Sequence, residues 1–135
     1  MNLALKLYFL VPTVQFVKTS YSTNEKSGAF SVTLMRTGDL SYTSTIRCYT
    51  RSMTAQVQRD FKERTDTDAS IILFNPGETR KSCPVTIVDD LVFEGQEAFK
   101  LKLGSADRNT RIGERNETEI AILDEADSKY FDNLI

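Results

Sequence analysis

The sequence contains no histidine and only two cysteines among its 135 residues. Without histidine, the chain lacks the usual general base and the commonest ligand of transition metals. Two cysteines alone cannot complete a Cys/His zinc site. Serines are plentiful, but no base accompanies them, so we expect no enzyme. Oxygen ligands for a hard cation such as calcium remain available.

The chain also lacks an apolar run long enough to cross a bilayer. Residues 1–11 are mostly apolar, but the segment is short and Lys6 interrupts it. A signal peptide needs an unbroken apolar centre and a small-residue cleavage site, and residues 11–14 (VPTV) make a poor one. We interpret residues 1–11 as a lead-in or a remnant of a preceding segment, and we expect no direct membrane insertion.

Net charge is small, at -2, but it is unevenly distributed. Residues 1–58 carry six Lys/Arg against two Asp/Glu, a balance of +4, whereas residues 59–135 carry eleven against seventeen, a balance of -6. A chain with this overall balance has no general attraction for nucleic acid, so no nucleic-acid partner is expected. The acidic excess lies in the half that holds most of the acidic candidates described below.

Short runs of alternating apolar and polar residues, separated by turn signals, predict an all-β fold. The expected strands lie near residues 14–16, 30–34, 41–51, 70–74, 79–88, 99–103 and 117–123. Residues 22–28, 52–68 and 104–116 are expected to be polar connections. The pattern predicts a seven-stranded antiparallel, immunoglobulin-like β-sandwich over residues 12–127, with a tail or linker at 128–135.

One strand-to-strand connection is unusually acidic. Asp89, Asp90, Glu94 and Glu97 lie within nine positions of each other. Like charges this close repel, and a shared cation would relieve the repulsion. The alternative is a set of independent, solvated turn residues, since aspartate favours turns in any case. Spacing alone does not choose between these two interpretations.

Other acids follow other expected strands. In an up-and-down sandwich, connections after odd-numbered strands share one end, so their side chains can converge. Calcium takes six to eight oxygen ligands, often from several carboxylates. The candidate ligands are Glu25, Asp60, Asp89, Asp90, Glu94, Asp124, Glu125 and Asp127.

Two further features bear on cellular location. Cys48 and Cys83 both fall on the apolar side of their expected strands. They could form a bridge across the core, as in an oxidising compartment, or remain two buried thiols. Asn116-Glu117-Thr118 is an N-glycosylation sequon, although such triplets often arise by chance. Together these features favour secretion.

Several short motifs, in their order and spacing, resemble one known family. The motifs are residues 25–28 (EKSG), 36–40 (RTGDL), 54–55 (TA), 60–61 (DF), 74–79 (FNPGET), 89–90 (DD), 93–99 (FEGQEAF) and 122–124 (ILD). From Val14 to Asp127 the chain resembles a Calx-beta domain, the sandwich module of sodium–calcium exchangers, integrin β4 and several matrix proteins. Residues 46–51 (IRCYTR) and 81–87 (KSCPVTI) are most similar to the Calx-beta repeats of FRAS/FREM extracellular-matrix proteins.

The resemblance implies an extracellular module, in matrix or basement membrane, within a large secreted or membrane-anchored chain. Its expected role is calcium-dependent cell–matrix adhesion, and its expected partners are neighbouring domains and other matrix or cell-surface proteins. The family's calcium ligands correspond to Glu25, Asp60, Asp89, Asp90, Glu94, Asp124 and Glu125, with Asp127 as a substitute. These are the residues that spacing also selected.

The chain departs from the family pattern at three places. Leu91 replaces a third aspartate, Ala126 interrupts the last acidic run, and residues 57–59 (VQR) replace a segment that usually contains glycine. These departures predict that this domain binds fewer calcium ions than the exchanger domains, or binds them more weakly. Two alternatives stay open: a structural or protein-binding sandwich without calcium, and an intracellular calcium sensor resembling the exchanger domains.

Overall fold

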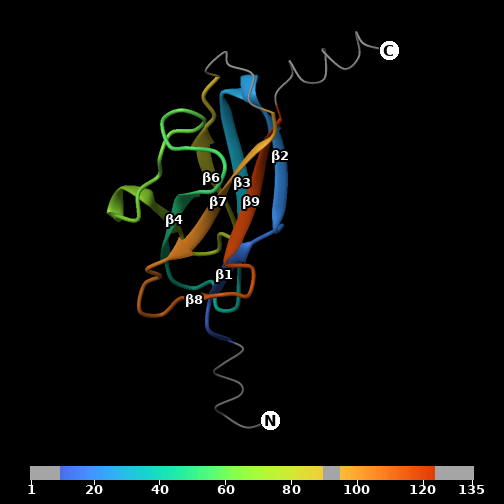
Figure 1. Cartoon of the computed structure of the whole chain (residues 1–135). Coiled ribbons are helices and arrows are strands. Elements are labelled where there is room, and N and C mark those ends of the chain that lie inside the picture. Colours follow the sequence, from blue (N-terminus) through green and yellow to red (C-terminus); the bar gives the residue numbers. More distant parts are fainter. Residues whose placement is uncertain (1–9, 90–94, 124–135) are drawn as a thin grey trace.

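The computed structural model describes residues 10–89 and 95–123, which form two β-sheets packed face to face (Figure 1). The strands are β1 (Thr13–Phe16), β2 (Ser20–Asn24), β3 (Ala29–Thr37), β4 (Ser44–Ser52), β5 (Ile71–Phe74), β6 (Arg80–Thr86), β7 (Glu97–Gly104), β8 (Arg111–Ile112) and β9 (Glu117–Leu123). Two single-turn 3-10 helices, η1 (Glu25–Ser27) and η2 (Asp68–Ser70), complete the regular structure of these residues. The all-β sandwich is confirmed.

The strand order is β6-β3-β1-β8 in one sheet and β2-β9-β7-β4-β5 in the other. This order is not an up-and-down meander, so that expectation was wrong. Consecutive strands still reverse direction often enough that β2, β4, β6 and β9 all end at one end of the sandwich. We call this the upper end, as drawn in Figure 1, and the opposite end the lower end.

Alternation along each strand builds the core, because one face of each sheet is turned toward the other sheet. The fully buried side chains come from both sheets: Val14, Phe16, Val32, Leu34, Ile46, Phe74, Phe99, Leu101 and Ile120. Near the upper end, Phe61 joins them from the connection after β4, stacking on Phe99 at 4.1 Å between ring centroids. That connection is therefore anchored in the core.

The described residues contain nine strands, two more than expected. β2 begins before the expected polar connection 22–28 and overlaps its first residues, and β8 lies in the expected connection 104–116. β2 is an edge strand with one buried residue, Thr23, so it lacks an apolar stripe. Two pairs, β1 with β8 and β2 with β9, are parallel, whereas the sequence predicted only antiparallel pairing.

Two expected turns are present, and each contains a glycine with a positive φ angle. Gly38 has φ 93°, and a Cβ there would lie 2.5 Å from the Val11 carbonyl oxygen. Gly77 has φ 83° in the turn between β5 and β6, which Glu78 N closes by donating to Asn75 O at 3.0 Å. Both turns lie at the lower end. Among the described residues, no helix is long and apolar enough to cross a membrane.

Candidate metal site

Strand register brings the segments that carry the candidate ligands to the upper end. Asn24, the last residue of β2, lies beside Leu123, the last residue of β9. The end of β6 lies beside the start of β3, where Thr86 pairs with Ala29. Glu25 therefore follows the end of β2 at the upper end, and Asp89 comes shortly after the end of β6.

Glu25 begins a tightly capped turn. The Asn24 side chain accepts a hydrogen bond from Lys26 N at 2.9 Å, and Ser27 Oγ accepts one from Asn24 N at 3.2 Å. Gly28, with φ 70°, ends the turn, and its carbonyl accepts a hydrogen bond from Ile87 N at 2.6 Å. The turn that positions Glu25 is thus fixed to the segment that leads to Asp89.

Asp60 is buried, with 7% of its surface exposed, in the connection after β4. Its Oδ2 accepts a hydrogen bond from Gln56 N at 2.8 Å, and its own N donates to Gln56 O at 2.9 Å. Its carbonyl oxygen accepts a hydrogen bond from Val88 N at 2.9 Å. The Asp60 backbone is therefore joined directly to the residue that precedes Asp89.

The loop before Asp60 shows the effect of a departure from the family pattern. Gln58 has φ 70°, a left-handed conformation that glycine adopts freely and that other residues adopt at a cost of about 1–2 kcal/mol. Gln58 N donates to Phe61 O at 2.6 Å, which holds the turn in this geometry. Gln58 therefore occupies a backbone conformation that favours glycine.

Three of the eight candidate ligands fall within the described residues: Glu25, Asp60 and Asp89. Their segments meet at the upper end, and their carboxylates are the hard oxygen donors that suit calcium. The other five candidates, Asp90, Glu94, Asp124, Glu125 and Asp127, lie outside the described residues. Within the described part of the chain, no three acidic, cysteine or histidine side chains are grouped closely enough to hold a metal. The described donors fit the chemistry of a calcium site but do not complete one.

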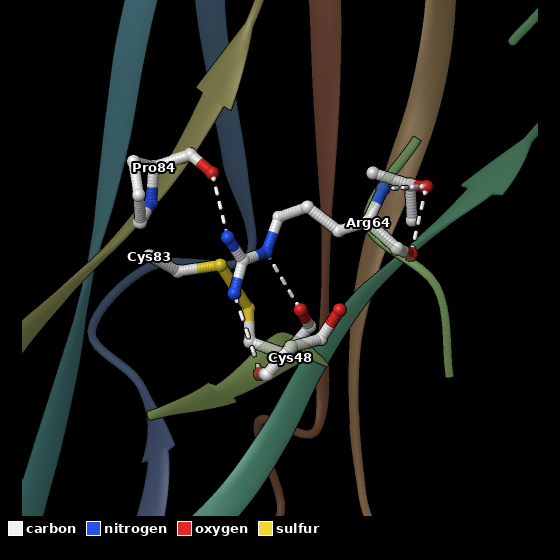
Figure 2. The surroundings of a disulfide bond; sticks show 6 residues. Cys48, Arg64, Cys83 and Pro84 are labelled. Atoms are coloured by element: carbon white, nitrogen blue, oxygen red, sulfur yellow. Dashed lines mark hydrogen bonds between the residues drawn. A yellow bond between two sulfur atoms is a disulfide. The ribbon is translucent and has the colours of Figure 1, made fainter. Parts of the chain in front are cut away.

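Cys48 of β4 and Cys83 of β6 form a disulfide between the two sheets, with Cα atoms 6.5 Å apart (Figure 2). The bridge that strand parity allowed is present, and the alternative of two free thiols is not. Figure 2 also shows Arg64 spanning the bridge, with its guanidinium donating to Cys48 O at 2.8 Å and Pro84 O at 3.2 Å. Partial burial lowers the pKa of Arg64.

Arg36 is a structural residue that sequence reasoning missed. Only 1% of its surface is exposed, and its guanidinium donates to Glu78 O, Tyr42 O, Asn75 O and Ser44 Oγ at 2.8–3.0 Å. It also lies over the ring of Phe74, at 5.4 Å from the centroid. The missed signal was its place on the strand, since Val32, Leu34 and Arg36 occupy successive inward positions.

The remaining candidate, Asn116, lies at the lower end, directly before β9. Its side chain is exposed, as a glycosylation site requires. It is therefore at the opposite end of the sandwich from Glu25, Asp60 and Asp89. Modification there would not place a glycan at the candidate metal site.

Comparison with protein-family models finds a match to the Calx-beta domain over residues 10–126. Among curated proteins, human FRAS1-related extracellular matrix protein 2 is 45% identical to this chain over 87% of the length of this chain. This chain is 43% identical to Extracellular matrix protein 3 of Lytechinus variegatus, also over 87%, and 32% identical to mouse sodium/calcium exchanger 1 over 77%. The chain covers only 4%, 4% and 10% of these relatives, respectively.

Solved structures give the same result. The apo-form Calx CBD1 domain matches with a TM-score of 0.77 and 26% identity, over 84% of this chain and 97% of that one. The calcium binding domain CBD12 of CALX1.1 matches with a TM-score of 0.75 and 27% identity, over 82% of this chain and 45% of that one. The family-model match over residues 10–126 includes every strand described above.

Proposed function

The chain belongs to the Calx-beta family, and from this premise we propose that it is a non-enzymatic, calcium-binding module of an extracellular-matrix protein. Calcium binding at the upper end stiffens that end of the sandwich and so fixes its angle to the next domain. The larger protein that contains this domain then serves adhesion between cells and matrix, through neighbouring domains and other matrix or cell-surface proteins. The similarity to matrix proteins and the disulfide between β4 and β6 support the extracellular location.

The observation that carries the calcium proposal is the meeting of three acidic segments at one end. The η1 turn with Glu25 is bonded to Ile87, and Asp60 is bonded to Val88. Both connections therefore converge on the segment that continues into Asp89 and Asp90. A relative named as an exchanger of calcium, at 32% identity, strengthens this interpretation.

Within this proposal, Glu25, Asp60 and Asp89 supply oxygen ligands from three different connections, together with the acidic residues at 90, 94, 124, 125 and 127. The ion supplies positive charge that offsets the mutual repulsion of these carboxylates. The chain's own contribution is to hold the connections in place through the backbone hydrogen bonds to Ile87 and Val88. Calcium thereby joins segments from both sheets.

Titration of calcium into the chelated protein tests this proposal. For a dissociation constant of roughly 10⁻⁴–10⁻³ M, typical of extracellular modules, about 10 mM calcium should add about 1.4–2.7 kcal/mol to the unfolding free energy. That gain corresponds to a rise on the order of 5–10 °C in melting temperature for a domain of this size. Differential scanning calorimetry measures the shift directly.

A pair of variants localises the effect. Asp89→Asn removes one negative charge at the upper end, and it should remove most of the calcium-dependent shift. Glu114→Gln removes one negative charge at an exposed position between β8 and β9, and it should leave the shift unchanged. If millimolar calcium left the melting temperature of the parent protein (the chain without substitutions) unchanged, the calcium proposal would be wrong.

The alternative is a structural or protein-binding sandwich without calcium. Asp60 already uses Oδ2 to accept a hydrogen bond from Gln56 N, and Arg59 places a cation beside it in the sequence. Calorimetry that detects no heat from calcium, but detects binding to a neighbouring matrix protein, would favour this alternative. The intracellular-sensor alternative is disfavoured by the disulfide, because cytosolic thiols are normally kept reduced.

A further inference from the structure

Asn116 lies in the chain's single sequon, Asn116-Glu117-Thr118, at the start of β9. Its hydrogen bonds are made by its backbone: its N donates to Glu114 O, and its carbonyl accepts from Leu103 N, both at 2.9 Å. The backbone is thus fixed at the end of the sheet while the side chain is exposed. The amide is presented to solvent without taking part in the fold.

Thr118, the third residue of the sequon, is placed very differently. It shares the inward parity of Ile120 and Ile122 on β9, pairs with Leu101 of β7, and has 1% of its surface exposed. Its hydroxyl is buried and has no hydrogen-bond partner within residues 10–89 and 95–123. A buried hydroxyl without a partner is destabilising, and valine has nearly the same shape without the polar atom.

The folded domain therefore gains nothing from the hydroxyl that distinguishes Thr118 from valine. N-glycosylation does require it, because the modification is specific for Asn-X-Ser/Thr. Once β9 is in the sheet, however, this hydroxyl is inaccessible to any enzyme. Recognition of the hydroxyl has to precede the docking of β9.

We propose that Asn116 carries an N-linked glycan, attached before β9 joins the sheet, and that the Thr118 hydroxyl serves this modification rather than the fold. The donor is an oligosaccharide linked through a diphosphate to a lipid carrier. The Asn116 side-chain nitrogen forms a bond to the anomeric carbon, the anomeric carbon–oxygen bond breaks, the lipid diphosphate leaves with the electron pair, and the amide nitrogen loses one proton.

The folded structure has room for the product. Asn116 borders an open hollow of about 460 Å³ whose lining includes Thr19, Lys100, Glu117 and Glu119. These polar side chains can hydrogen-bond to a sugar. The proposal rests on the extracellular location in the proposed function, because the donor is met only on the secretory route.

The test is secretion of the whole chain behind an added signal peptide from eukaryotic cells, followed by mass measurement before and after enzymatic removal of N-glycans. The parent protein and Thr118→Ser should lose mass on treatment, whereas Asn116→Gln and Thr118→Val should not. A secreted parent protein without a glycan would overturn the modification. It would not count against the extracellular location, which is supported independently by the similarity to matrix proteins and by the disulfide.

A second measurement tests whether the Thr118 hydroxyl also contributes to the stability of the fold. In unglycosylated protein from bacteria, Thr118→Val should melt at the same temperature as the parent protein or higher. A clearly lower melting temperature would show that the fold uses the hydroxyl, and would overturn that part of the proposal. Loss of calcium binding with the glycan still present would count against the proposed function alone.

Discussion

Arg36 is a buried charged residue at the lower end of the sandwich. A buried guanidinium without hydrogen bonds would be very unfavourable, and here four oxygen atoms accept hydrogen bonds from it, two near the start of β4 and two in the β5–β6 turn. The acceptors are three carbonyls and one hydroxyl, so a single side chain joins the end of β3 to the start of β4 and to the β5–β6 turn. Arg36 acts as a polar core for this end.

Replacing Arg36 therefore tests this role. Arg36→Met fills much of the volume but leaves the carbonyls of Tyr42, Asn75 and Glu78 without their donor, and we expect a loss of about 3–5 kcal/mol of unfolding free energy. Urea denaturation measures the loss. Arg80→Ala, at an exposed position on β6, is the matched control and should change stability by less than about 0.5 kcal/mol.

The sequence predicted some residues well and missed others for a physical reason. Parity along a strand identified the inward positions of Cys48 and Cys83, because alternation is a local property of the backbone. The same parity places Arg36 inward, but charge argues for exposure, and only distant carbonyls decide the outcome. The Asp60 bond to Gln56 N is likewise hidden in loop geometry.

At the scale of strands, the disulfide is the only covalent link between side chains of the two sheets among the described residues. It joins β4 to β6, and Arg64 reinforces the same place by donating to carbonyls of both strands. Short runs of apolar residues between turn signals predicted seven of these strands: β1, β3, β4, β5, β6, β7 and β9. The sequence missed β2 and β8 because their pairing with β9 and β1 comes from partners far away in the chain.

Removal of the bridge should be costly. The disulfide closes a loop with a sequence separation of 35 residues, for which the chain-entropy estimate gives about 3–4 kcal/mol. We expect the double variant Cys48→Ala, Cys83→Ala to lose about 2–4 kcal/mol of unfolding free energy relative to the oxidised protein. The reduced parent protein should resemble the double variant, and equal stability of all three would contradict the expectation.

For the whole molecule, acidic residues fix loops at both ends of the sandwich. At the upper end Asp60 accepts a hydrogen bond from Gln56 N, and at the lower end Asp107 accepts hydrogen bonds from two backbone N–H groups. Burial opposes the charge of Asp107, but hydrogen bonds from Thr45 N at 2.7 Å and Asn109 N at 3.0 Å outweigh it and lower its pKa. Asp107 thereby fixes the β7–β8 connection to the start of β4.

This arrangement predicts a specific acid dependence. Because the pKa of Asp107 is lower in the folded than in the unfolded chain, its stabilisation is present above the unfolded value of about 3.9 and is lost as pH falls through the folded value. Asp107→Asn should flatten the fall in unfolding free energy between about pH 5 and pH 2. Chemical denaturation across this range measures the slopes, and identical slopes in both proteins would contradict the assignment.

The parallel pairing of β2 with β9 has a mechanical consequence. The N-terminal segment crosses from one sheet to the other, and Ser20–Asn24 lies beside Glu119–Leu123 (Figure 1). The chain enters the sandwich at the lower end and leaves β9 at the upper end. Tension between the two ends therefore pulls β1, through which the chain enters, and β9 in opposite directions along their length. It loads the hydrogen bonds of β1 with β3, and those of β9 with β2 and β7, in shear together rather than opening them one by one.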